Sequence, residues 1–408
     1  MTDDPRPFHF ITDAETLARV AGEVLTGARE IGVDAEMNGL HAFRARTCVL
    51  QIATETADVV VDTVVVKDLR SLEPILSSKE IVHFLHGAAH DVKCMKADFG
   101  LHLGGLFDTY IAAQLLGVEK LGYGDIVSTR FGVTLDKALQ TCDWGKRPLE
   151  KKQIDYLKGD VRYLIELGRQ LRAELIAKDL LEEATYEFGR VAALPIDDES
   201  LAADCYLRPK ESRELAPIGL AVLRELMMVR HAIARGLDRP PFKVVRDEVL
   251  VEIARKRPAT SEDLGKIQGL PRHASPRMLA ELHDAVLRGV EAGAPPPLPA
   301  RVVIGPRPDG DEIRARRARE DALRSWRKQT AGNRSVPPMA VLPSYSMEDI
   351  VRDPPASLDA LAKRPGLIPK RVRLHGAAIL QTLATATASS SSRRDAAAAA
   401  ANSGGDEG

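Results

Sequence analysis

Residues 31–36 read Ile-Gly-Val-Asp-Ala-Glu, an apolar stretch that closes on two acids. Its β-branched residues predict a short β-strand. Residues i and i+2 of a strand point to the same face of the sheet, so Asp34 and Glu36 are expected to project together. A pair of acids at a strand end is, taken alone, more often solvated than functional. A role for this pair therefore depends on the rest of the chain.

Three further side chains with catalytic potential come from two later segments. Asp91 follows a glycine turn at 86–90 that separates an apolar run from an amphipathic segment, which predicts a strand-to-helix junction. Tyr156 and Asp160 lie in a helical pattern over 150–175. Positions i and i+4 of a helix are neighbours on its surface, so these two side chains are expected to converge.

Four carboxylates and a phenol are the set of groups that a metal-dependent nuclease uses. Mg²⁺ is a hard cation that takes oxygen ligands, and its protein sites combine a few carboxylates with a phosphate. Four acids suit two such ions. Two ions about 3.5 to 4 Å apart stabilise both the attacking and the leaving oxygen of a phosphoryl displacement. A phenol can orient the attacking water. Without metal, the acids would repel one another and some of their pKa values would rise.

The three segments resemble ribonuclease D, which belongs to the tyrosine-containing branch of the DEDD 3′–5′ exonucleases. The resemblance spans roughly residues 8 to 175. Ala35 stands where the family usually has threonine, a departure that removes no ligand. The matching phrases are VDAE at 33–36, HGAAHD at 86–91 and YLKGDV at 156–161, with connecting phrases CVLQI at 48–52, FDT at 107–109 and DWGKRPL at 143–149.

The resemblance implies an active enzyme with an α/β, ribonuclease H-like exonuclease domain, in which helices flank a mixed sheet. It implies hydrolysis that trims the 3′ ends of structured RNA, such as tRNA precursors, and releases nucleoside 5′-monophosphates. The implied partner is RNA with a free 3′ end. DNA is also a possible substrate, because the carboxylates do not distinguish ribose from deoxyribose. The four acids would hold two divalent metal ions, Mg²⁺ or Mn²⁺. The catalytic residues so implied are Asp34, Glu36, Asp91, Tyr156 and Asp160.

The C-terminal half contains a repeat. Pro240-Pro241 precedes Gly269-Leu270 by the same interval that separates Pro337-Pro338 from Gly366-Leu367. Self-similarity at one fixed offset predicts two copies of one domain. Each copy resembles the HRDC domain, a small all-helical module found in ribonuclease D and RecQ-type helicases. Two such modules imply auxiliary binding of nucleic acid, although they also serve as packing or protein-contact domains.

These patterns divide the chain into domains and connecting segments. A first strand is expected at 8–11, followed by a helix that Thr12 caps. Strands at 32–36, 47–53 and 59–62 are expected to form an antiparallel meander. The predicted divisions are an exonuclease domain at 1–194, a linker at 195–212, HRDC-like domains at 213–291 and 313–383, a Pro-rich linker at 292–312, and a disordered Ala- and Ser-rich tail at 384–408.

Candidate contacts to nucleic acid lie outside the four acids. His90 is a candidate phosphate contact. Arg314 and Arg317 belong to the densest basic segment, but acids interleave with it, so a solvated helix face explains it equally well. Lys370 and Arg371 follow a glycine turn at a helix start, where free N–H groups and two cations could hold a phosphate. An ordinary connection between helices is the alternative for this last site.

Composition limits the classes of protein to which this chain can belong. The chain has 408 residues, of which 44% are hydrophobic, and a formal net charge of −1. The four cysteines are widely spread, which favours free thiols in a reducing compartment. The start is acidic and no run approaches about 18 apolar residues, so we expect a soluble, cytoplasmic protein without a membrane span. The sequence identifies no protein partner.

Three alternatives are weighed against this interpretation. His83, His86, His90 and Cys94 are potential zinc ligands, but their spacing crosses from strand through turn to helix and fits no usual zinc pattern. A DNA-repair exonuclease would differ from the RNA enzyme in its ratio of activities on RNA and DNA. A non-catalytic RNA-binding adaptor would keep its function after Asp34→Ala.

Overall fold

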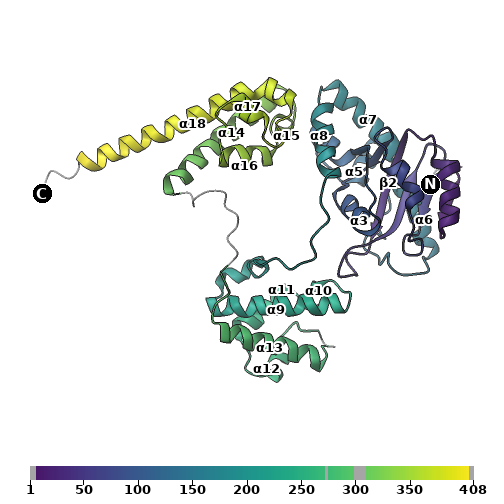
Figure 1. Ribbon diagram of the computed structural model, residues 1–408, viewed down its shortest axis with the longest axis horizontal. Helices are drawn as coiled ribbons and strands as arrows, with labels where there is room; N and C mark the ends of the chain where they lie inside the picture. Colours follow the sequence, from purple (N-terminus) through teal and green to yellow (C-terminus); the bar gives the residue numbers. More distant parts are fainter. Residues whose placement is uncertain (1–5, 272–273, 298–308, 404–408) are drawn as a thin grey trace.

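The computed structural model describes residues 6–271, 274–297 and 309–403, with every side chain in these ranges except those of Asp160 and residues 387–403. An α/β domain is followed by two small helical domains, as Figure 1 shows. This confirms the predicted fold class. Across the described ranges, no helix is both long and apolar enough to span a bilayer. The four cysteines are free thiols.

The strands described in the N-terminal domain form one mixed sheet of six, in the order β1-β4-β3-β2-β5-β6. β2 pairs antiparallel with β3, and β3 pairs antiparallel with β4, which confirms the predicted meander. The remaining pairs are parallel. The strands are β1 (Phe8–Ile11), β2 (Glu30–Met37), β3 (Thr47–Ala53), β4 (Asp58–Val61), β5 (Val82–Leu85) and β6 (Leu106–Asp108).

Helices cover this sheet and complete its core. The first helix is capped by Asp13 rather than by Thr12, because the Asp13 carboxylate accepts the N–H of Thr16 at 2.8 Å. The helical pattern expected over 150–175 divides after Asp160 into two helices. The helices are α1 (Ala14–Val20), continued by a π-helical turn (Ala21–Leu25), α2 (Glu73–Leu76), α3 (Ala89–Phe99), α4 (Thr109–Leu116), α5 (Tyr123–Phe131), α6 (Lys151–Asp160), α7 (Leu164–Ala177) and α8 (Leu181–Ala192).

The two C-terminal domains repeat one arrangement of helices. The repeat extends to the backbone, since Asp238 and Ser335 both have positive φ at matching positions, as do Gly269 and Gly366. The first copy comprises α9 (Pro217–Gly236), α10 (Pro241–Val244), α11 (Asp247–Lys256), α12 (Ser261–Gly265) and α13 (Pro276–Ala292). The second comprises α14 (Gly310–Asn333), α15 (Pro338–Val341), α16 (Ser344–Arg352), α17 (Leu358–Ala362) and α18 (Pro369–Ser403).

Two expected boundaries differ from the structure. The predicted linker at 195–212 contains Cys205 and Tyr206, which are buried in the core of the first helical domain. The tail expected to be disordered from 384 instead continues α18 as far as Ser403. Alanine has the highest helix propensity, which accounts for this extension. Residues 404–408 lie outside the described part of the chain.

Acid is expected to destabilise the N-terminal domain through His83 on β5. The ring is fully buried; its Nε2 lies 3.0 Å from the Ile75 carbonyl, and its Nδ1 accepts the Gly105 N–H at 3.3 Å. Burial lowers the pKa of His83 to about 4. The unfolded chain, with a histidine pKa of about 6.5, therefore binds more protons between pH 6.5 and 4. The free energy of unfolding should fall across that window by up to about 3 kcal/mol.

Urea unfolding of wild type and His83→Gln at neutral and acidic pH tests this. Glutamine can keep both hydrogen bonds but does not titrate, so the variant should lose less stability as the pH falls. His102, which is exposed, provides the control: His102→Gln should follow the wild-type pH curve. Parallel pH curves for wild type and His83→Gln would show that His83 does not carry the effect.

Candidate active site

The end of β2 carries Asp34 and Glu36. The two acids alternate with Ala35, so they share one face of the sheet, and a β-bulge follows directly between Glu36 and Met37. Such bulges redirect side chains at the end of a strand. On β3, Gln51 lies opposite Asp34 and donates its amide N–H to Asp34 Oδ2 at 3.3 Å. The local structure thus confirms the predicted strand and the shared face.

Asp91 lies in the first turn of α3, at the strand-to-helix junction that the sequence predicts. β5 runs parallel to β2, so the turn after β5 lies at the same edge of the sheet as the end of β2. Asp108 fixes this turn, because its carboxylate accepts the N–H groups of Gly87 and Ala88, both at 2.9 Å. Gly87 has a φ of +72°, a conformation that favours glycine.

Asp160 is brought to the same edge by a close approach of the main chain. A Cβ placed on Gly32 of β2 would lie 3.2 Å from the Val161 carbonyl oxygen and 3.1 Å from Leu164 Cβ. The corner between α6 and α7 therefore packs against β2 two residues before Asp34. Asp160 is the last residue of α6, although its side chain is not among those the structure describes.

Tyr156 lies on α6, one turn before Asp160. It is half-buried, and its ring centroid is 5.8 Å from that of Trp144, which is fully buried. Leu157 packs in the same small cluster and holds α6 against β3. The packing of Trp144 and Leu157 therefore limits how far Tyr156 can move.

The electrostatics of the site are set by burial and by repulsion between neighbouring carboxylates. Burial raises the pKa of Asp34 to about 7. Burial, followed by the nearby charges of Asp34 and Asp108, raises the pKa of Asp91 well above its usual range. Among the described residues, neither Asp34 nor Asp91 has an ion-pair partner. A buried, unpaired carboxylate is costly unless a cation offsets its charge.

The donor set fits a hard divalent metal ion. Asp34 and Asp91 offer carboxylate oxygens close to each other, and Glu36 shares the face of Asp34. Within the described side chains no three His, Cys, Asp or Glu residues converge tightly enough to hold a metal ion, and Asp160 is outside that set. A cation would offset the repulsion that raises both pKa values. The zinc alternative fits less well, since both ring nitrogens of His83 and of His86 already face hydrogen-bonding partners in the protein.

The predicted contacts to nucleic acid are divided among three places. His90 is exposed on α3, and its Nε2 lies 3.8 Å from Cys94 Sγ. Arg314 and Arg317 are exposed on α14 in the second helical domain, where Arg314 pairs with Asp311. Much of the surrounding basic segment is likewise paired within its own domain. These pairs are Arg316 and Arg319 with Glu312, and Arg324 with Glu320.

Lys370 and Arg371 do not face solvent, which overturns the expectation that they hold a phosphate. Lys370 Nζ lies 3.0 Å from Glu183 Oε2, and the Arg371 guanidinium donates to the Gly366 carbonyl at 2.8 Å. Both side chains are buried. They belong to the interface where the second helical domain packs on α8 (Figure 1), in which Tyr345 also donates to Glu187 at 2.7 Å. The sequence indicated their charge but not the carboxylates that face them.

Three positions acquire roles that local sequence patterns did not assign. Asp108 positions the turn before Asp91, Gln51 donates to Asp34, and Gly32 admits the corner that ends α6. The phrases CVLQI and FDT, singled out by resemblance, contain Gln51 and Asp108. No sequence pattern indicated the role of Gly32, because the residues that approach it, Val161 and Leu164, are distant in the sequence.

The comparisons with known proteins define the class. Residues 8–176 match the family described as 3′–5′ exonuclease, and residues 219–286 and 316–383 each match the HRDC domain. This confirms the predicted extent of the exonuclease motifs and the two copies of the helical module. The protein is thus an exonuclease that carries two HRDC domains.

Relatives identify the family within that class. Ribonuclease D of Jannaschia sp. (strain CCS1) is 30% identical over 353 residues, which are 84% of this chain and 88% of the relative. Ribonuclease D of Sphingobium indicum is 32% identical over 263 residues, 64% of this chain and 67% of the relative. The chain belongs to the ribonuclease D family. It is a 3′–5′ exoribonuclease, and its family uses divalent metal ions.

Solved structures agree with the fold. The catalytic core of RRP6 from Trypanosoma brucei matches with a TM-score of 0.64 at 26% identity, covering 72% of this chain and 82% of that one. Escherichia coli RNase D, described as an exoribonuclease involved in structured RNA processing, matches with a TM-score of 0.66 at 23% identity. That match covers 93% of this chain and 99% of the other, and it supports the fold alone.

Proposed function

We propose that this exoribonuclease trims the 3′ ends of structured RNAs, such as tRNA precursors, and releases nucleoside 5′-monophosphates. The observation that carries the proposal is the pairing of Asp34 with Asp91, two close carboxylates with raised pKa values and no cation partner among the described residues. Such a pair is suited to metal-assisted phosphodiester hydrolysis. Asp34, Glu36, Asp91 and Asp160 would hold two divalent ions, Mg²⁺ or Mn²⁺.

Each side chain has a distinct task in this proposal. Asp34, Glu36 and Asp160 would share one ion, and Asp34 and Asp91 would support the other. Bound ions of this kind acidify a water and stabilise charge on the reacting phosphate. The Tyr156 hydroxyl would orient the attacking water, since Trp144 limits the positions of its ring. Gln51 keeps Asp34 in place by its amide hydrogen bond.

The HRDC domains would hold the folded part of the RNA while its 3′ tail reaches the acids. His90, and the exposed Arg314 and Arg317, are the candidate contacts that face solvent. We place no contact at Lys370 or Arg371.

A time course on matched 5′-labelled single-stranded RNA and DNA tests the proposal. With Mg²⁺ or Mn²⁺, the RNA should shorten one nucleotide at a time and release 5′-monophosphates, and EDTA should stop the reaction. The 3′ extension of a tRNA precursor should be removed, and shortening should stop when it reaches the base-paired stem. Faster shortening of the DNA would instead favour a repair exonuclease. Intact RNA that the protein nevertheless binds would favour a non-catalytic adaptor.

A further inference from the structure

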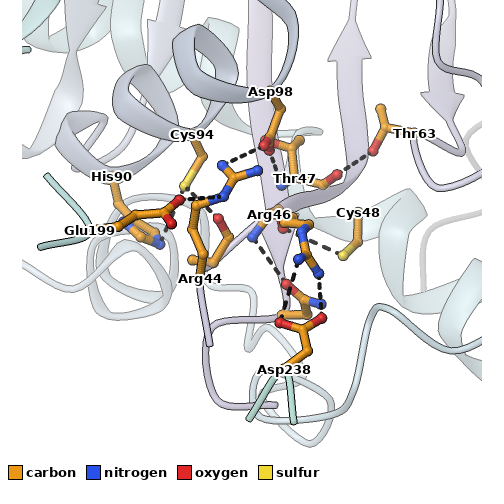
Figure 2. Close-up of polar contacts among 12 residues, drawn as sticks. Arg44, Arg46, Thr47, Cys48, Thr63, His90, Cys94, Asp98, Glu199 and Asp238 are labelled. Carbon is orange, nitrogen blue, oxygen red and sulfur yellow. Dashed lines mark hydrogen bonds and ion pairs between the residues drawn. The ribbon is translucent and has the colours of Figure 1, made fainter. Parts of the chain in front are cut away.

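A cavity of about 290 Å³ lies between the exonuclease domain and the first HRDC domain. Its walls are residues 43–45 of the loop that joins β2 to β3, one face of α3 that includes His90 and Lys93, linker residues 196–199, and His231 and Pro241 of the HRDC domain. Figure 2 shows Arg44 and Arg46 of this loop beside His90, Cys94 and Asp98 of α3. The loop begins two residues after Glu36, and His90 directly precedes Asp91, so the cavity adjoins the catalytic acids.

Two cations in this cavity are paired with acids of the linker. Arg44 Nε lies 3.2 Å from Glu199 Oε1, and Lys93 Nζ lies 2.6 Å from Asp197 Oδ1. The linker carboxylates are largely solvent-exposed, at 48% for Glu199 and 69% for Asp197. Ion pairs of this kind contribute little to stability, because water and salt compete for both partners.

Arg44 is held in place independently of the linker. Its Nη1 lies 2.7 Å from Asp98 Oδ1, and the Asp98 carboxylate, which is 8% exposed, also accepts the Thr47 N–H at 2.7 Å (Figure 2). If Glu199 moves away, the guanidinium keeps its position and its Nε edge becomes available. A guanidinium edge binds phosphate in the same way that it binds carboxylate.

The first HRDC domain also has a separate attachment to the loop. Arg46 Nη1 lies 2.8 Å from Asp238 Oδ2, and the Phe43 N–H donates to Asp238 Oδ1 at 3.2 Å. These contacts do not involve residues 196–199. The acidic part of the linker can therefore leave the two cations without breaking the contact between the loop and the HRDC domain.

We propose that Arg44 and Lys93 bind phosphates of the RNA strand on the 5′ side of the nucleotide being removed, and that Asp197 and Glu199 occupy these cations until RNA displaces them. The inference rests on the proposed function and adds a regulated phosphate site to it. Contacts between cations and phosphates supply much of the affinity for nucleic acid. The linker carboxylates therefore lower the affinity for RNA, and they favour strands whose phosphates compete effectively.

The test measures Kd for a short 5′-fluorescein oligoadenylate by anisotropy, with the full chain in EDTA to prevent cleavage. Asp197→Asn with Glu199→Gln should lower Kd about three- to tenfold at low salt. Arg44→Gln with Lys93→Gln should raise Kd and reduce the slope of log Kd against log salt by about 1.4, the value for two phosphate contacts on a single strand. In that background, the linker substitutions should have no further effect.

A matched control removes two other linker charges. Asp198 and Glu211 are exposed, and the carboxylate of Asp198 accepts hydrogen bonds from Ser200 rather than from a cation of the cavity. Asp198→Asn with Glu211→Gln should leave Kd within about twofold of wild type, because the ion pairs of Arg44 and Lys93 are with Glu199 and Asp197 and stay intact in this variant. An equal gain in affinity from this control, or no gain from the Asp197 and Glu199 variant, would overturn the inference.

Activity assays separate this inference from the proposed function. If wild type shortens RNA but its Kd is insensitive to the linker acids, the inference alone is wrong. If wild type neither binds nor shortens RNA, the proposed function is wrong and the inference with it. Since the linker substitutions are at exposed positions, the variants should fold normally, and their circular dichroism should match that of wild type.

Discussion

Asp34→Asn is expected to slow the shortening of RNA by on the order of 10³-fold or more while leaving RNA binding in EDTA unchanged. Asparagine has nearly the same size and can still accept the Gln51 amide hydrogen bond at 3.3 Å. It lacks the negative charge that a divalent ion would require. The measurement is single-turnover shortening of 5′-labelled RNA in saturating Mg²⁺, together with Kd from anisotropy.

Asp155 offers a matched control on the element that carries Tyr156. Its carboxylate is exposed on α6 and pairs with Lys158 at 2.9 Å. Asp155→Asn removes the same charge by the same substitution and should keep the rate within about twofold of wild type, because an exposed ion pair contributes little. If Asp34→Asn also retained most of the wild-type rate, the Asp34 carboxylate would not be a metal ligand.

Lys370→Met is expected to destabilise the docked second HRDC domain by about 3 to 5 kcal/mol. Glu183, on α8, is fully buried and lies 3.0 Å from the Lys370 ammonium. The variant either leaves this carboxylate buried without a cation or releases the HRDC domain from α8. Trp326 lies in this domain, so its fluorescence during urea unfolding, in a Trp144→Phe background, reports the loss.

Two further variants separate the buried pair from general effects of charge. Lys370→Met combined with Glu183→Leu removes both charges and should recover much of the stability, because no unpaired carboxylate stays buried. Arg314→Ala removes an exposed cation from the same domain and should cost less than about 1 kcal/mol. Equal unfolding midpoints for wild type and Lys370→Met would show that the pair does not hold the domain.

The sequence predicted the elements of the catalytic domain because their signals are local. The alternation through Asp34 and Glu36, the glycine turn before Asp91 and the helical spacing of Tyr156 and Asp160 each depend on a few neighbouring residues. The strands and helices found there agree with those signals. The two helical domains could also be predicted, since a repeat at one fixed offset is visible in the sequence without any knowledge of the fold.

The predictions that the structure contradicts failed for physical reasons that local sequence patterns do not capture. Lys370 has the charge of a phosphate ligand, but its environment is set by Glu183, which is far away in the sequence and close in the fold. Cys205 and Tyr206 were predicted to lie in a linker, but both are buried in the core of the first HRDC domain. In the tail, composition suggested disorder, whereas the helix propensity of alanine extends α18. Local patterns do not determine which domain surfaces meet.

The geometry of the candidate active site depends on the close approach of the main chain at Gly32. The acids come from three separate elements, yet the separation between the α6 acid and the β2 acids is fixed by a contact in which no acid takes part. A single hydrogen atom in place of a side chain lets the Val161 carbonyl approach the strand. The spacing of the proposed metal ligands is therefore a property of main-chain packing, which the presence of all four acids in the sequence does not by itself guarantee.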